Sequence, residues 1–160
     1  KKIVNSPAYI GAELYLRKKK NWKYSADFLE HSLQDNPSDL YYGNKSALAK
    51  KLKKSRKIRN KVKKFKKSNY LAKKYSISFK HGDMFGAFHN VDLYIDRFKK
   101  GKINCVLKDY YDFSYEKYNS FINIANNYEW VCQAFKISNG YHITVEMKFK
   151  DRKNKNKDLI

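Results

Sequence analysis

The chain has 160 residues, with 36 lysines and arginines against 15 acidic residues, which gives a formal net charge of +21. This length suits one domain, or one domain with an appendage, and two cysteines are too few for a disulfide framework. The sequence contains no run of 18 apolar residues, so we expect no transmembrane helix. The excess of positive charge points to an anionic partner.

The positive charge lies mainly in the first half of the chain. Residues 1–80 hold 23 basic and 5 acidic residues, and residues 45–74 alone hold 15 basic residues and no acidic one. Such asymmetry suggests that the two halves do different jobs. It predicts a basic helical segment over residues 1–74, an α+β core over 75–150 and a charged tail over 151–160.

The first half reads as helical. A serine followed by proline predicts the start of a helix over residues 6–20, and an apolar stripe predicts a second helix over 25–34. Residues 41–44 read as a loop. Apolar residues at intervals of three or four predict one long helix over 46–68, whose narrow stripe leaves most of its surface to solvent or an anionic partner.

After residue 69 the apolar residues alternate, which is typical of strands. We predict a strand over 75–79, a hairpin formed by 87–98 and 102–113, a helix over 116–136 and a final strand over 140–149. Together the elements predict an α+β fold. Its basic helical N-terminal half would pack beside a small, curved antiparallel sheet that carries one helix.

The candidate site lies at the end of the hairpin, in the segment Asp109-Tyr110-Tyr111-Asp112-Phe113. We take Asp109, Tyr111 and Asp112 as candidate catalytic residues. Two carboxylates held close together could bind Mg²⁺ or Ca²⁺ through oxygen ligands, or one could act as an acid while the other is ionised. In the alternative interpretation the aspartates cap the following turn and helix, and Tyr111 and Phe113 belong to the core.

The pattern Asp-x-Tyr-Asp-Phe after a strand resembles the signature of the colicin M type of bacterial toxin, over roughly residues 76–150. The segment 22–41 is also similar to C-terminal toxin modules of bacterial polymorphic toxins, both Rhs-type and contact-dependent. The resemblance implies a bacteriocin-like antibacterial toxin with a cognate immunity protein. It would be delivered into the periplasm of a target bacterium, and no signal peptide is expected in this sequence.

The resemblance also implies a reaction, the hydrolysis of a phosphodiester in lipid II, the lipid-linked peptidoglycan precursor at the inner membrane. In colicin M relatives a His-Arg pair follows the second aspartate, and at that spacing this chain has Tyr118-Asn119. Whether the chain is an enzyme is therefore open. A non-enzymatic, membrane-acting toxin is an alternative.

The basic run supplies candidates for binding anions. We expect Lys61, Lys63, Lys64, Lys66 and Lys67 to contact an anionic membrane surface. The alternatives are nucleic-acid phosphates, as in a nucleic-acid-binding toxin or an RNase that uses His81 or His142, and a merely solvated helix. Arginines are few, which disfavours sequence-specific base reading. We expect a monomer, and buried thiols at both cysteines.

Overall fold

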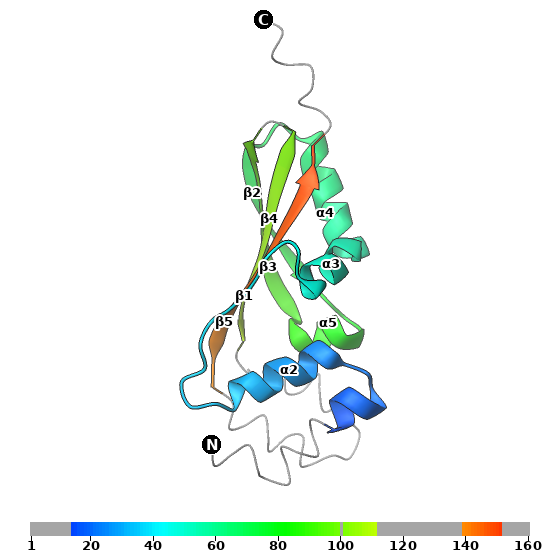
Figure 1. The fold of residues 1–160 in the computed structure, drawn as a ribbon. Coiled ribbons are helices and arrows are strands. Elements are labelled where there is room, and N and C mark those ends of the chain that lie inside the picture. The colour runs from blue at the N-terminus through cyan, green and yellow to red at the C-terminus, as the bar shows by residue number, and fades with distance from the viewer. Residues whose placement is uncertain (1–13, 100, 112–138, 152–160) are drawn as a thin grey trace, which may run out of the picture. The chain divides into compact units, whose positions relative to one another are not determined.

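The computed structural model describes residues 14–99, 101–111 and 139–151. In chain order the elements are η1 (Tyr15–Lys19, a π-helical turn), α2 (Lys23–Ser32), β1 (Leu40–Tyr42), α3 (Ala47–Lys54), α4 (Arg56–Lys67), β2 (Ala72–Ser78), α5 (Gly82–Ala87), β3 (Asn90–Lys99), β4 (Lys102–Tyr111) and β5 (Tyr141–Lys150) (Figure 1). The fold is α+β, as the sequence predicts.

The chain forms two compact units that alternate along the sequence. The first unit comprises residues 1–39, 78–89 and 110–142, and the second comprises 40–77, 90–109 and 143–160. The boundary predicted after residue 74 falls inside β2. The helix expected over 116–136, the tail after residue 151 and most of the helix expected over 6–20 lie outside the described residues.

The sheet has the strand order β1-β5-β4-β3-β2. β3 and β4 form the expected antiparallel hairpin, with Leu93 opposite Leu107. β1 pairs in parallel with β5, with Tyr41 opposite Thr144, so the sheet is mixed rather than antiparallel. β1 also corrects the loop expected over 41–44. Three residues are too few to show an alternating pattern, and a strand this short depends on its partner.

In the second unit, α3 and α4 lie along one face of the sheet (Figure 1). Alternation along the strands explains the core, because every second side chain points toward the helices. The helices add leucines and aromatics from their apolar stripes. The buried residues of this core include Leu48, Leu52, Ile58, Val62, Phe65, Leu93, Ile95, Ile103, Cys105, Leu107, Ile143, Val145 and Met147.

The long helix expected over 46–68 is broken into α3 and α4 at Ser55. Ser55 adopts an extended backbone, with φ −59° and ψ 126°, and its N–H donates to the carbonyl of Leu52 at 2.9 Å. Leu52 and Ile58 are six residues apart, so an unbroken helix would point them about 120° apart. The break lets both side chains be buried in the same core.

Arg97 fixes the C-terminal end of α4. Its Nη2 lies 3.1 to 3.2 Å from the carbonyl oxygens of Phe65, Lys66 and Ser68, and its Nε donates to the buried carboxylate of Asp151 at 2.8 Å. The last carbonyls of a helix have no partner within the helix. The guanidinium supplies one, and it thereby holds the end of α4 on the sheet.

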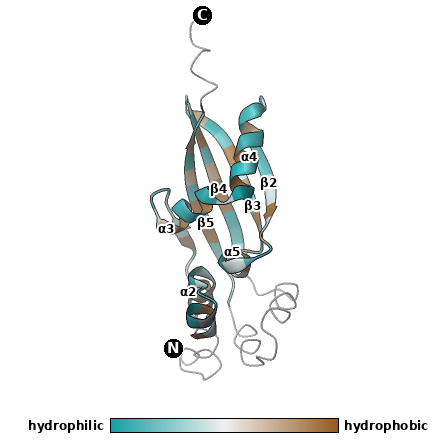
Figure 2. Cartoon of the chain, turned by 90° about the vertical axis from the view of Figure 1, so that its right-hand side faces the viewer, coloured by the Kyte–Doolittle hydropathy of each residue, from teal (hydrophilic) through white to brown (hydrophobic). Residues whose placement is uncertain are grey.

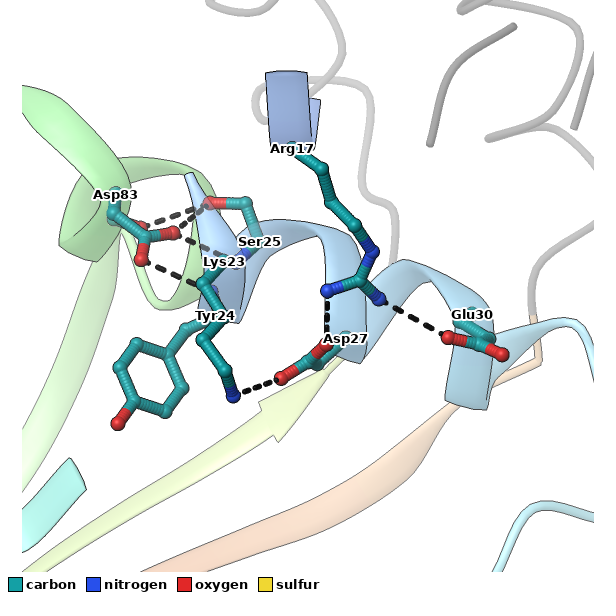
Figure 3. Close-up of polar contacts among 7 residues, drawn as sticks. All are labelled: Arg17, Lys23, Tyr24, Ser25, Asp27, Glu30 and Asp83. Carbon is teal, nitrogen blue, oxygen red and sulfur yellow. Dashed lines mark hydrogen bonds and ion pairs between the residues drawn. The ribbon is translucent and has the colours of Figure 1, made fainter. Parts of the chain in front are cut away.

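In the first unit, Asp83 of α5 caps the N-terminus of α2 (Figure 3). Its carboxylate accepts from the N–H groups of Tyr24 and Ser25, at 2.9 and 2.8 Å, and from the Ser25 hydroxyl at 2.8 Å. Gly86 lets α5 approach this closely, because a Cβ there would lie 2.4 Å from the Ser25 hydroxyl oxygen. α5 was not predicted, and its presence delays the start of β3 to Asn90.

The core of the first unit is aromatic. Phe28 lies edge-on to Phe88, with ring centroids 5.4 Å apart, and edge-on to Tyr111 at 6.1 Å. Tyr111 stacks on Tyr141 at 5.1 Å, and the Tyr141 hydroxyl donates to the Phe28 carbonyl at 2.8 Å. Such ring pairs stabilise a fold beyond the area they bury.

Candidate functional site

The acidic motif continues β4 into the first unit. Asp109 is half-buried, Tyr110 is exposed, and Tyr111 is only 1% exposed. Because side chains alternate along a strand, Tyr111 has the parity of the buried residues Ile103, Cys105 and Leu107. Asp112 lies outside the described residues.

This placement bears on the two interpretations of the motif. The ring of Tyr111 is packed between Phe28 and Tyr141, which favours the core role over a catalytic one for this residue. The catalytic role of Asp109 and Asp112 stays a prediction. Within the described ranges no three His, Cys, Asp or Glu side chains come together to hold a metal ion, and the proposed Mg²⁺ or Ca²⁺ pair also stays a prediction.

The exposed phenol of the motif is Tyr110, which is not among the site residues predicted from the sequence. Its ring lies 4.8 Å from the imidazole of His142. Gly140 makes room for it, because a Cβ there would lie 2.1 Å from the Tyr110 hydroxyl oxygen. The backbone N–H of His142 donates to the Asp39 carboxylate at 2.8 Å. The surface of the first unit thus places a phenol beside an imidazole. The other candidate histidine, His81, is exposed at the N-cap of α5.

The basic helix α4 has its cations outside and its apolar stripe inside. Eight of its twelve residues are lysine or arginine, its first turn has no acidic residue, and Ile58, Val62 and Phe65 are buried. Figure 2 shows the corresponding division between hydrophilic and hydrophobic residues. Cations at the N-terminus oppose the helix dipole, and like charges three or four residues apart repel each other. A bound polyanion would relieve both effects.

The five candidate lysines of α4 are not equivalent. Lys63, Lys64 and Lys67 are exposed, whereas Lys61 and Lys66 are half-buried. The Nζ of Lys61 lies 5.5 Å from the centroid of the Tyr75 ring, so this side chain lies against the sheet. Contact with a large anionic surface would therefore depend mainly on the three exposed lysines.

Two exposed apolar side chains follow α4 directly. Tyr70 is 50% exposed and Leu71 is 77% exposed. Their backbone is held in place, because the N–H of Arg97 donates to the Leu71 carbonyl at 2.9 Å and its guanidinium donates to the Tyr70 carbonyl. The ammonium of Lys73 lies 4.1 Å from the centroid of the Tyr70 ring. The sequence signal was present, as an apolar pair inside a lysine-rich run.

A comparison with protein families, curated proteins and solved structures finds no match to this chain. The resemblance to colicin M and to polymorphic toxin modules therefore stays a prediction. In the described part of the chain no helix is both long enough and apolar enough to cross a bilayer.

Proposed function

We propose that this chain is an antibacterial toxin domain that acts at the inner membrane of a target cell, with its second unit bound to the anionic lipid surface. The observation that carries the proposal is the combination of exposed lysines on α4 with the exposed side chains of Tyr70 and Leu71. Lysines near anionic headgroups and apolar side chains at the acyl boundary are the two elements of interfacial binding.

The buried stripe of α4 limits how the helix could bind. Ile58, Val62 and Phe65 belong to the core, so α4 would adsorb through its charges rather than insert. Each lysine near an anionic surface contributes about 1 kcal/mol, and burying a leucine side chain contributes about 2 kcal/mol. Three lysines and Leu71 would give about 5 kcal/mol, which corresponds to a Kd on the order of 0.1 mM and to reversible, salt-sensitive binding.

The proposed substrate is a lipid-linked peptidoglycan precursor, cleaved at a phosphodiester, and it comes from the resemblance of the motif to colicin M. The half-buried Asp109 and the exposed pair of Tyr110 and His142 support it, because proton transfer to or from a phosphate ester needs such groups. Tyr118-Asn119 replaces the family's His-Arg pair. If the domain is catalytic, His142 is the group we propose for proton transfer in place of that missing histidine. A cognate immunity protein belongs to the same proposal.

A second candidate, binding to single-stranded nucleic acid, is favoured by one observation in the second unit. Tyr94 on β3 is 38% exposed, and the ammonium groups of Lys74 and Lys108 lie 5.7 and 5.3 Å from its ring centroid. An aromatic ring flanked by cations on a sheet is a stacking platform for bases. Against it, Asp92 pairs with Lys74 at 3.1 Å, which places a carboxylate where phosphates would bind.

Vesicle co-sedimentation distinguishes the two candidates. We expect the chain to bind phosphatidylglycerol vesicles at low salt and to dissociate from them at high salt. It should not bind phosphatidylcholine vesicles. Lys63→Gln with Lys64→Gln should weaken binding about 30-fold, at about 1 kcal/mol for each lysine. Lys18→Gln with Lys80→Gln makes the same charge change in the first unit and should have little effect.

Two results would contradict the membrane proposal. One is equal binding to vesicles with and without anionic lipid. The other is an RNA oligonucleotide that binds more tightly than the vesicles and loses its affinity in Tyr94→Ala, which would establish the nucleic-acid candidate.

A further inference from the structure

The strand β2 forms one outer edge of the sheet (Figure 2). The strand order places β3 on one side of it, and within the described ranges no strand lies on its other side. An edge strand presents backbone N–H and C=O groups that can pair with a strand of another chain. The sheet could therefore be extended at β2.

The pairing of β2 with β3 determines which backbone groups face outward. The N–H of Arg97 donates to the Leu71 carbonyl at 2.9 Å, and the N–H of Phe79 donates to the His89 carbonyl at 2.7 Å. Leu71 and Phe79 are eight residues apart, and so are His89 and Arg97, so the strands pair antiparallel without a bulge. Bonded residues alternate along such a pair, so the even-numbered residues of β2 direct their backbone groups to the free edge. They include Ala72, Lys74 and Ser76, whose side chains are exposed.

Two ammonium groups lie on the helix side of this edge. The Nζ of Lys61, from α4, lies 5.5 Å from the centroid of the Tyr75 ring. The Nζ of Lys73 lies 5.9 Å from the same centroid and 4.1 Å from that of Tyr70. In the part of the chain that the structure describes, neither ammonium group forms an ion pair. Acidic side chains on a strand added beside β2 would supply carboxylates to both.

The opposite face of the edge offers space for apolar side chains. An open hollow of about 370 Å³ is lined by Ala72, Lys73, Lys74, Tyr94, Ile95 and Asp96. In this register Ala72 lies opposite Asp96, and its small side chain leaves room beside the Tyr94 ring, which is 38% exposed. The ammonium of Lys74 is already paired with Asp92 at 3.1 Å. An apolar side chain fits this hollow better than an acidic one, which the carboxylate of Asp96 would repel.

A second copy of this chain would not suit the edge. β2 contains two lysines and no acidic residue, and the chain has a net charge of +21. Pairing two β2 edges would bring the lysines of both copies together, and like charges on neighbouring strands are destabilising. Lysines on an edge strand are a common protection against such self-association. The same lysines attract a strand of opposite charge.

We propose that β2 binds an extended acidic segment of another protein, which adds to the sheet as a further strand. Its acidic side chains lie toward Lys61 and Lys73. Its apolar side chains alternate with them and lie toward Ala72 and Tyr94. In this mode of recognition the main-chain hydrogen bonds give affinity, and the alternate side chains give specificity. The site does not depend on the membrane proposal.

The test is calorimetric titration of the full chain with two synthetic peptides of the same composition. One alternates its acidic residues, Thr-Glu-Val-Glu-Val-Glu-Thr, and the other groups them, Glu-Glu-Glu-Thr-Val-Val-Thr. The alternating peptide should bind about tenfold more tightly, because only it presents one kind of side chain to each face. Lys61→Gln with Lys73→Gln should weaken its binding about tenfold, because two cross-strand ion pairs are lost. Lys102→Gln with Lys150→Gln, on β4 and β5, removes the same charge and should have little effect.

Backbone pairing is tested separately. Ser76→Pro removes an N–H group that faces the free edge and leaves the bonds to β3 in place, so it should abolish binding of the alternating peptide in a chain that circular dichroism shows to be folded. Methylation of the peptide's own backbone nitrogens tests the unsubstituted chain. It should abolish binding at the valines or at the glutamates but not at both, because only one set faces β2.

Hydrogen exchange locates the added strand. The backbone amides of Lys74 and Ser76 should exchange freely in the chain alone and become protected when the alternating peptide binds. The proposal is overturned if these amides gain no protection, if the grouped peptide binds as tightly as the alternating one, or if both double lysine variants weaken binding equally. Equal binding of the two methylated peptides would also overturn it.

Discussion

The cap that Asp83 provides for α2 gives the sharpest test of the first unit's structure. Asp83 is 8% exposed, and its two carboxylate oxygens accept from the backbone N–H groups of Tyr24 and Ser25 (Figure 3). Asp83→Ala removes both acceptors and leaves two helix N–H groups without them. Asp83→Asn keeps one acceptor but turns an NH₂ group toward the other donor.

The magnitude follows from these contacts. A hydrogen bond to a charged group contributes about 1.5 to 3 kcal/mol, a helix N-cap contributes about 1 kcal/mol, and the interaction with the helix dipole adds about 0.5 kcal/mol. The three contributions overlap. We expect Asp83→Ala to lower the free energy of unfolding by about 3 kcal/mol and Asp83→Asn to lower it by about 1.5 kcal/mol.

Urea denaturation followed by circular dichroism measures the effect. The matched control is Asp27→Ala on α2 itself, because Asp27 forms ion pairs with Arg17 and Lys23 at the surface, at 2.6 and 2.9 Å. Surface ion pairs contribute below about 1 kcal/mol. If Asp83→Ala is no more destabilising than Asp27→Ala, the carboxylate does not cap α2 and the reasoning is wrong.

The remaining predictions concern four other sites. Arg97→Lys keeps the charge but loses the planar fork at the end of α4; we expect a loss of about 2 kcal/mol in urea denaturation, and an unchanged midpoint would contradict it. Burial raises the pKa of the Cys105 thiol to about 12, so at pH 8 iodoacetamide should label Cys105 only after unfolding. Above pH ~9 the unfolded thiol loses its proton while the folded thiol keeps it. The free energy of unfolding should therefore decrease as the pH rises above this value. Leu71→Ser should weaken binding to anionic vesicles about 30-fold, because about 2 kcal/mol of apolar burial is lost, and should leave stability unchanged. Asp109→Asn with Asp112→Asn should abolish toxicity in a folded protein; a toxic double variant would restrict both residues to capping.

Alternation along the chain predicted the strands best. Along β3, β4 and β5 a series of apolar residues at every second position is buried. These residues are Val91, Leu93 and Ile95 in β3, Ile103, Cys105 and Leu107 in β4, and Tyr141, Ile143, Val145 and Met147 in β5. The helices were predicted less well at their ends. The break at Ser55 depends on how two apolar stripes face one core, and α5 exists in contact with α2. Both are tertiary effects that local pattern does not carry.

The candidate site was only partly predictable for the same reason. Strand alternation in the sequence already predicted that Tyr111 lies on the same face as the buried residues. It was nevertheless predicted to be catalytic, because it lies between the two aspartates of the motif. Tyr110 lies beside His142 on β5 and over Gly140, which directly precedes β5. Both residues are distant from Tyr110 in the sequence, so the local pattern does not show the contact.

We propose that this chain acts at the inner membrane of a target bacterium, from the periplasmic side. The direct measurement compares the survival of bacteria that express the chain in the cytoplasm with that of bacteria that export it to the periplasm, at equal protein levels. We expect killing with lysis when the chain is exported and near-normal growth when it stays in the cytoplasm. Killing from the cytoplasm with loss of RNA, and no effect on export, would contradict it.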